Sequence, residues 1–132
     1  MDGRFFPWGD VLDPSWCCMR DSHAGRPLPV VVDSCAVDES PFGVRGMGGN
    51  VQDWCADLFA REGPPVPGSR VVPPVLPEIV DLDPASRRVY RGGGWDGIAR
   101  RARCAPRFGF VPSSRYANLG LRPARSFLPS SL

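Results

Sequence analysis

The stretch SPFGVRGMGGNVQDWCADLF, residues 40–59, decides the fold of this chain because a glycine cluster runs directly into a polar and aromatic segment. The cluster consists of Gly43, Gly46, Gly48 and Gly49. Glycine is used where the backbone takes a positive φ or where another group must approach it closely. From Val51 onward apolar and polar residues roughly alternate, which favours a strand over a helix. The stretch therefore predicts a shaped turn that feeds a strand, with some group seated against the turn.

The length and composition of the chain fit one soluble domain over residues 1–132. The chain has 132 residues, of which 42% are apolar and 23% are charged, and such values are ordinary for a globular protein. No uncharged apolar run reaches the length of about 18 residues that could span a bilayer. The opening MDGRFFPWGD has acids and no apolar signal region, so we expect a cytoplasmic protein with no membrane partner.

The cysteines predict free thiols rather than a disulfide framework. There are five of them, an odd number that includes the adjacent pair Cys17 and Cys18, and this pattern also favours the cytoplasm. The chain has no CxxC motif, and His23 is its only histidine. These features argue against a zinc or non-haem iron site built within the chain.

The charges are divided unevenly along the chain. All 16 basic residues are arginines; residues 85–132 hold ten of them and one acid, Asp96, whereas residues 1–84 hold six arginines and thirteen acids. Such asymmetry can mark a nucleic-acid surface. Because the net charge is only +2, we favour pairing of the two halves within one fold and expect no nucleic-acid partner.

The rest of the chain predicts a loop-rich fold with short antiparallel strands. No long amphipathic helix is evident, a short β-branched run suggests a strand at 29–32, and the six prolines of residues 61–78 predict a surface loop. The segment RRVYRGGGWDG, residues 87–97, predicts a strand broken by glycines. A closing strand is expected at Leu119 and Leu121, which would share one face.

Three blocks in the same order resemble the formylglycine-generating enzyme, or sulfatase-modifying factor, family. They are GRFFPWGD (3–10), the opening stretch (40–59), and RVYRGGGWD followed by NLGLRPAR (88–125). The resemblance implies an α+β, C-type lectin-like fold and covers only the C-terminal part of the family domain. The fold would be truncated at its N-terminal side, so we expect a partner chain or domain, or rearranged packing, to cover apolar surface.

The resemblance also implies a calcium site at the glycine turn. By position, the ligands would be the carbonyls of Gly48, Gly49 and Val51 and the carboxylate of Asp53. Calcium takes six to eight oxygen ligands, and glycines allow several carbonyls to converge. The family more often has glutamate at the position of Asp53, and the alternative is a turn without an ion. A second family calcium site would need an asparagine near Cys18, so we expect that site to be lost.

Oxidase activity in the family resembles copper–thiolate chemistry, in which two cysteines after an RGGS motif bind Cu(I) and a substrate cysteine becomes formylglycine. This chain reads RGGGWDGIARRARC: Gly94 replaces the serine, the first cysteine position falls on Gly97, and the second falls on Ala99 or Ala102. Only Cys104 lies nearby. We therefore expect no catalytic residues and no copper, with Cys104, paired with Cys55 or Cys35, as the alternative route to an oxidase acting on a sulfatase cysteine.

What remains is a scaffold whose irregular C-terminal loops predict a surface for a protein or peptide ligand. Arginines and aromatic residues dominate binding hot spots. The candidate residues are Asp96, Arg100, Arg101, Arg103, Phe108, Arg115 and Tyr116. The favoured function is a non-catalytic binding or scaffolding module, and a further alternative is a diversified, lectin-like ligand-display domain.

Overall fold

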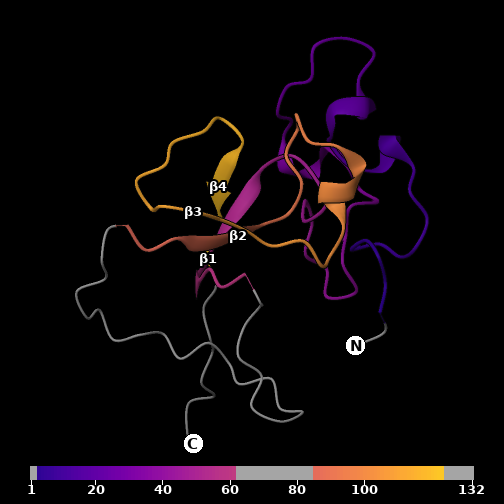
Figure 1. Cartoon of the computed structure of the whole chain (residues 1–132). Coiled ribbons are helices and arrows are strands. Elements are labelled where there is room, and N and C mark those ends of the chain that lie inside the picture. Colours follow the sequence, from indigo (N-terminus) through magenta and orange to yellow (C-terminus); the bar gives the residue numbers. More distant parts are fainter. Residues whose placement is uncertain (1–2, 62–84, 124–132) are drawn as a thin grey trace, which may run out of the picture.

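The computed structural model describes residues 3–61 and 85–123, which are arranged around one four-stranded sheet (Figure 1). The strands are β1 (Gln52–Leu58), β2 (Arg88–Arg91), β3 (Phe108–Phe110) and β4 (Leu119–Leu121). Short 3-10 helices are η1 (Pro14–Trp16), η2 (Arg20–Ser22), η3 (Val32–Ser34) and η4 (Ala99–Ala102). The strands predicted after the glycine turn, after residue 87 and at Leu119–Leu121 are confirmed. Except for Arg61, the predicted proline-rich loop lies outside the described residues.

The sheet has the strand order β3-β2-β1-β4 and is mixed rather than wholly antiparallel. Antiparallel pairing is confirmed for β1 with β2 and for β2 with β3, whereas β1 and β4 run parallel, with Asp53 opposite Gly120. The antiparallel prediction is wrong for this pair because β4 does not follow β1 through a hairpin. A strand that returns after a long connection can lie in either direction.

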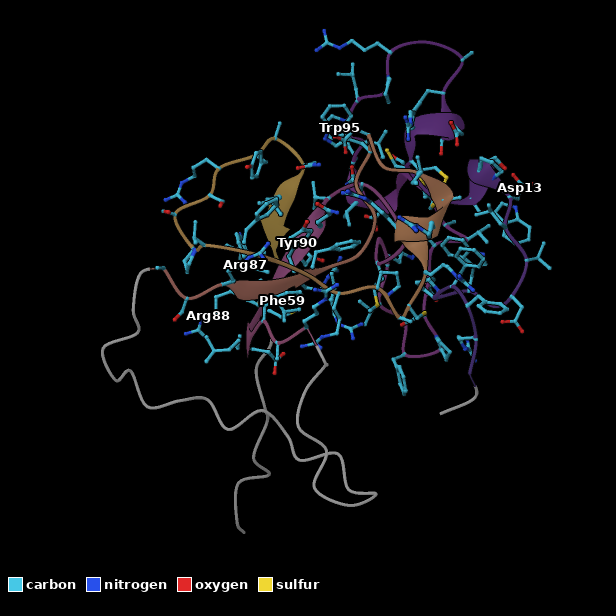
Figure 2. The ribbon with its side chains drawn as sticks, viewed as in Figure 1. Asp13, Phe59, Arg87, Arg88, Tyr90 and Trp95 are labelled. Carbon is cyan, nitrogen blue, oxygen red and sulfur yellow. The ribbon has the colours of Figure 1, made fainter. Side chains whose placement is uncertain are left out.

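Two further expectations about secondary structure are corrected. Residues 29–32 form no separate strand; η3 begins at Val32, and the backbone of Val30 is paired instead with the side chain of Asn50. The helical part of the predicted α+β class consists, in residues 3–61 and 85–123, only of 3-10 turns. In η1 the cause is local: Asp13 caps the N–H of Ser15 at 2.9 Å, and Pro14 supplies a preset φ, far from the sheet (Figure 2).

Aromatic side chains pack against one another between neighbouring strands of the sheet. Tyr90 of β2 meets Trp54 edge-on at 6.1 Å and stacks on Phe108 at 5.3 Å and Phe110 at 5.0 Å between ring centroids. Such pairs add about 0.5–1.5 kcal/mol each beyond the area they bury. Tyr116 extends the row by packing on Phe110. Packing across β1, β2 and β3 therefore supports strands that are too short to be stable alone.

The residue that follows β1, Phe59, makes an aromatic contact of its own. The guanidinium of Arg87 lies over the ring of Phe59, 5.2 Å from its centroid (Figure 2). The same ring packs on Gly109 of β3, where a Cβ atom would lie 2.4 Å from it. Gly109 is thus required for close approach of the chain beyond β1 to β3.

A small core lies beside the sheet, between the N-terminal segment and η4. It consists of Phe6, Cys17, Met19 and Ala102, with Trp8 and Ala99 packed against it. Phe6 and Trp8 are stacked with ring centroids 5.3 Å apart. The core joins residues from both ends of the chain, so the N-terminal block is an integral part of the fold.

Several large apolar side chains of the described residues remain exposed. The exposed fractions of Phe42, Val31 and Leu121 are 90%, 74% and 71%. Single exposed apolar residues are common on protein surfaces. Within the described part of the chain, no helix is long and apolar enough to cross a membrane.

Candidate functional site

The glycine turn is folded around a carboxylate of the same chain. Asp38, with an exposed fraction of 1%, accepts the N–H of Gly48 at 2.9 and 3.0 Å with its two oxygens and the N–H of Gly49 at 3.0 Å with Oδ2. Successive backbone N–H groups form an anion-binding concavity of this kind. We call Asp38 with these two N–H groups the carboxylate nest. The predicted group seated against the turn is therefore Asp38.

Burial raises the pKa of Asp38, and the N–H groups of Gly48 and Gly49 and the charge of Arg122 oppose the rise. The native protein thus holds this proton more tightly than the unfolded chain does. The stabilisation from this difference is fully present below the unfolded pKa and is lost as the pH rises through the raised native pKa. At neutral pH the hydrogen bonds of the nest compensate a buried negative charge.

The glycines are needed because neighbouring backbone lies directly against them. A Cβ atom at Gly49 would lie 2.4 Å from the carbonyl oxygen of Cys18, and one at Gly93 would lie 2.2 Å from the carbonyl oxygen of Gly48. At Gly48 it would lie 2.5 Å from the ring of Trp8. Gly46 is needed for a different reason: its φ of +69° is a backbone conformation that favours glycine. The turn is therefore packed between three other segments.

Asn50 is a structural centre that the sequence reasoning missed. It has a φ of +69°, unlike any other described non-glycine residue. Its side-chain amide pairs with the N–H and carbonyl of Val30, both at 3.0 Å. Its backbone N–H donates to Cys18 and its carbonyl accepts from Trp95, both at 2.7 Å. Its position after paired glycines was the available signal, because asparagine tolerates a positive φ.

The carboxylate of Asp53, one of the proposed calcium ligands, already contacts an arginine. Oδ2 of Asp53 accepts a hydrogen bond from Nε of Arg122 at 3.1 Å, and Nη2 of Arg122 donates to the carbonyl of Gly46 at 3.2 Å. The guanidinium neutralises the carboxylate that would face the ion. The residues therefore do not fit a calcium ion at Asp53 in this arrangement, and calcium binding by Gly48, Gly49, Val51 and Asp53 stays a prediction.

The positions that correspond to the family's oxidase motif leave little room for larger side chains. A Cβ atom at Gly94 would lie 2.9 Å from Oδ1 of Asp96, and one at Gly97 would lie 3.0 Å from the carbonyl oxygen of Gly94. Ala102 is buried in the core, and Ala99 packs against it. For a larger side chain at 94 the end of the Asp96 side chain would have to move, and for one at 97 the carbonyl of Gly94 would have to give way by a few tenths of an ångström.

Asp96 is the nearest neighbour of a Cβ atom at 94, and its own side chain has a partner. Both of its oxygens accept hydrogen bonds from the side-chain amide of Asn118, at 2.9 and 3.1 Å. This contact ties the loop after β2 to the residue before β4. Asp96 is exposed but has a structural partner, so it is a weaker ligand candidate than its sequence context indicates.

All five cysteines are free thiols, in different environments. Cys17 and Cys18 are buried, Cys35 and Cys55 are partly buried, and Cys104 is exposed. Burial raises the pKa of Cys17 to about 12, with further contributions from Asp38 and the neighbouring thiols of Cys35 and Cys18. Thiolate is the reactive form of cysteine, so burial and pKa both protect Cys17.

These environments predict the order in which the thiols react with iodoacetamide. In the native protein at mildly alkaline pH, Cys104 should be alkylated first and Cys17 only after unfolding. Alkylation for increasing times, followed by peptide mass spectrometry, measures each site, and the protein in denaturant is the control in which all five should react. Equal rates for Cys17 and Cys104 in the native state would contradict the placement of these residues.

The predicted ligand surface divides into separate places. Arg100, Arg103 and Phe108 line a hollow of about 640 Å³, and the guanidinium of Arg101 lies over the ring of Phe108, 5.0 Å from its centroid. The remaining lining is Gly3, Arg4, Phe5, Ala105 and Pro106. We call this the arginine hollow. The contribution of residues 3–5 was not predicted, because it depends on the N-terminal segment reaching the loop after η4.

Arg115 and Tyr116 lie elsewhere, beside β4. They line a second hollow of about 390 Å³ that also includes Trp54 and Leu121. Nη1 of Arg115 donates to the carbonyls of Pro112 and Ser114, at 3.3 and 3.2 Å, so this arginine helps to shape its own loop. The predicted residues therefore form two hollows and one structural contact rather than a single surface.

Comparison with known proteins identifies the same blocks. The model of the family described as sulfatase-modifying factor enzyme 1-like domain matches residues 2–127. A protein of Chlamydia caviae named serine/threonine-protein kinase pkn1 is 29% identical over 120 residues. The match covers 91% of this chain and 18% of that protein, so the chain spans less than a fifth of its relative's length.

Proposed function

The chain belongs to the family of sulfatase-modifying factor enzyme 1-like domains, and from that premise we propose that it is a non-catalytic member that serves as a protein- or peptide-binding module. The observation that carries the proposal is the replacement of the oxidase motif: Gly94 stands at the serine position, and Gly97 and Ala99 or Ala102 stand at the two cysteine positions. The chain has thus lost the side chains that the motif would use, and a Cβ atom at 94 or 97 would approach neighbouring atoms to 2.9 or 3.0 Å.

The remaining thiols support the same conclusion. Cu(I) in the family chemistry takes two thiolates, and one cysteine cannot replace them. Cys104 is exposed, whereas burial raises the pKa of Cys55 and of Cys35, the two suggested companions. A high thiol pKa disfavours the thiolate that binds copper.

The similarity to part of a longer protein supports a modular role. The matching segment is 18% of a protein named as a serine/threonine-protein kinase, so a domain of this kind occurs within a chain whose name describes another activity. Binding modules are commonly attached in this way. We do not extend the kinase activity to this chain, because the match leaves most of that protein uncovered.

We further propose the C-type lectin-like architecture, with a partner chain or domain over part of the surface. The exposed side chains of Phe42, Val31 and Leu121 support a partner, since exposed apolar residues of this size are costly in a small domain. Fold alone does not set function, so the proposal rests on the altered site.

An oxidase assay tests the non-catalytic assignment. The purified protein, loaded with Cu(I) and supplied with O₂, is incubated with a peptide that contains a CxPxR motif. We expect no formylglycine by mass spectrometry and no oxygen consumption above the protein-free control. The Cys104→Ser variant should behave like the parent protein. Copper-dependent conversion of the peptide that disappears in Cys104→Ser would refute the assignment.

A further inference from the structure

We propose that the arginine hollow binds an acidic segment of a partner protein, with carboxylates held by Arg100 and Arg103 and an apolar side chain placed against Phe108 and Pro106. This inference rests on the proposed function and adds the chemical class of the ligand. A hollow of about 640 Å³ lies in the range of sites that enclose small ligands. It can therefore take a few side chains of an extended peptide.

The lining of the hollow is basic. Its lining contains Arg4, Arg100 and Arg103 and, among the described residues that line it, no acid. In residues 3–61 and 85–123, neither Arg100 nor Arg103 forms an ion pair. Guanidinium groups gathered in this way repel one another and favour an anion between them.

Several arginines outside the hollow have partners within the fold. Arg45 pairs with Glu39 at 2.6 Å, and Arg122 pairs with Asp53 at 3.1 Å. Arg91 donates to the carbonyl of Cys104 at 2.8 Å. The uneven charge of the sequence is thus partly balanced by internal contacts, whereas Arg100 and Arg103 line the hollow beside residues 3–5.

One of the two arginines is held in place before any ligand arrives. The guanidinium of Arg103 lies 4.4 Å from the centroid of the Phe5 ring. A guanidinium fixed on an aromatic face loses less conformational freedom when it binds a carboxylate. The adjacent Cys104 N–H donates to the Phe5 carbonyl at 2.7 Å, so the two walls of the hollow are joined by the backbone.

The aromatic rings favour a peptide over a nucleic acid. Single strands bind by stacking bases on open aromatic faces. Here Arg103 lies over the ring of Phe5, and Phe108 already contacts Arg101 at 5.0 Å and Tyr90 at 5.3 Å. These contacts use ring surface on which a base would otherwise stack. Carboxylates beside an apolar residue match such a lining.

The test measures binding of a fluorescein-labelled peptide, about ten residues long and built from glutamate, leucine and glycine, by fluorescence anisotropy at physiological salt. The matched peptide has glutamine at every glutamate. The variants are Arg100→Glu and Arg103→Glu, and the control is Arg26→Glu, which makes the same change in net charge at an exposed arginine outside both hollows. Thermal unfolding of each variant checks that it is folded.

The acidic peptide should bind at least about tenfold more tightly than its glutamine counterpart, and Arg100→Glu and Arg103→Glu should each weaken binding about tenfold or more. Arg26→Glu should change it less than about twofold. If Arg103→Glu unfolds because its stack on Phe5 is lost, the exposed Arg100 still gives the decisive comparison.

Several results would overturn the inference: equal binding of both peptides, no binding of either, equal weakening by Arg26→Glu and Arg100→Glu, or tighter binding of a single-stranded oligonucleotide. If the glutamine peptide binds as tightly as the acidic one, the ligand need not be acidic, but the proposed role as a peptide-binding module would still hold. Failure of the non-catalytic assignment has its own signature, oxidation of the CxPxR peptide that depends on copper and Cys104, which these binding measurements do not produce.

Discussion

Replacing Asp38 with alanine should lower the free energy of unfolding by about 3–5 kcal/mol. The change removes the acceptor for the N–H groups of Gly48 and Gly49 and leaves them buried without a partner. Each unsatisfied buried donor costs about 1–3 kcal/mol. The lost side chain also leaves a void beneath the turn. Denaturant unfolding followed by tryptophan fluorescence measures the effect.

Two variants separate the nest from a general effect of losing a carboxylate. Asp33→Ala removes a carboxylate whose side chain is 73% exposed and whose ion pair with Arg45 spans 3.6 Å, so it should cost less than about 1 kcal/mol. Asp38→Asn keeps one oxygen acceptor, so its free energy of unfolding should lie between those of the parent protein and Asp38→Ala. An Asp38→Ala variant as stable as Asp33→Ala would show that the turn does not depend on the buried carboxylate.

Replacing Gly49 with alanine should destabilise the protein by at least about 3 kcal/mol. The new methyl group would lie 2.4 Å from the carbonyl oxygen and 2.8 Å from the nitrogen of Cys18. Backbone atoms cannot rotate away as the end of a side chain can, so the turn and the segment of Cys18 must separate. That movement would also strain the hydrogen bond from Asn50 to Cys18.

Gly25→Ala is the matched control for this prediction. No atom lies within 4 Å of a Cβ at Gly25, and this residue has no positive φ. The substitution should therefore change the free energy of unfolding by less than about 0.5 kcal/mol, or stabilise slightly by restricting the unfolded chain. Thermal or denaturant unfolding of both variants compares them directly, and similar values would contradict the close packing at Gly49.

The features that the sequence predicts correctly are local ones. Alternation after Val51 predicts β1, and Leu119 and Leu121 mark β4, because a strand shows its period within a few residues. The glycine cluster correctly predicts that a group is seated against the turn. The sequence did not identify this group as Asp38, because the pairing of a carboxylate with N–H groups ten or eleven residues away depends on the path of the backbone.

The features that the sequence does not predict depend on contacts between distant segments. Parallel pairing of β1 with β4 follows from the path of the chain between them, and the paired backbone at Val30 follows from the side chain of Asn50. The ligand surface shows the same limit. Composition selects Arg100, Arg103, Arg115 and Tyr116 together, but only the fold places the first two beside residues 3–5 and the others beside β4.

The environment of Asp53, a predicted calcium ligand, also depends on such contacts. The resemblance assigns Asp53 to an ion, whereas the structure places Arg122 at that carboxylate. A positive side chain from beyond β4 can neutralise Asp53 without any metal. The sequence alone could not pair these two residues, because 69 positions separate them.

The most direct test of the central claim, that the family's oxidase site has been dismantled here, is a Cu(I)-binding titration of the full chain against a competing chelator under reducing conditions. The parent protein and Cys104→Ser should bind copper equally, because glycine and alanine stand at the positions of the family's two copper-binding cysteines. A tight, stoichiometric copper site that is present in the parent protein and absent from Cys104→Ser would contradict the claim.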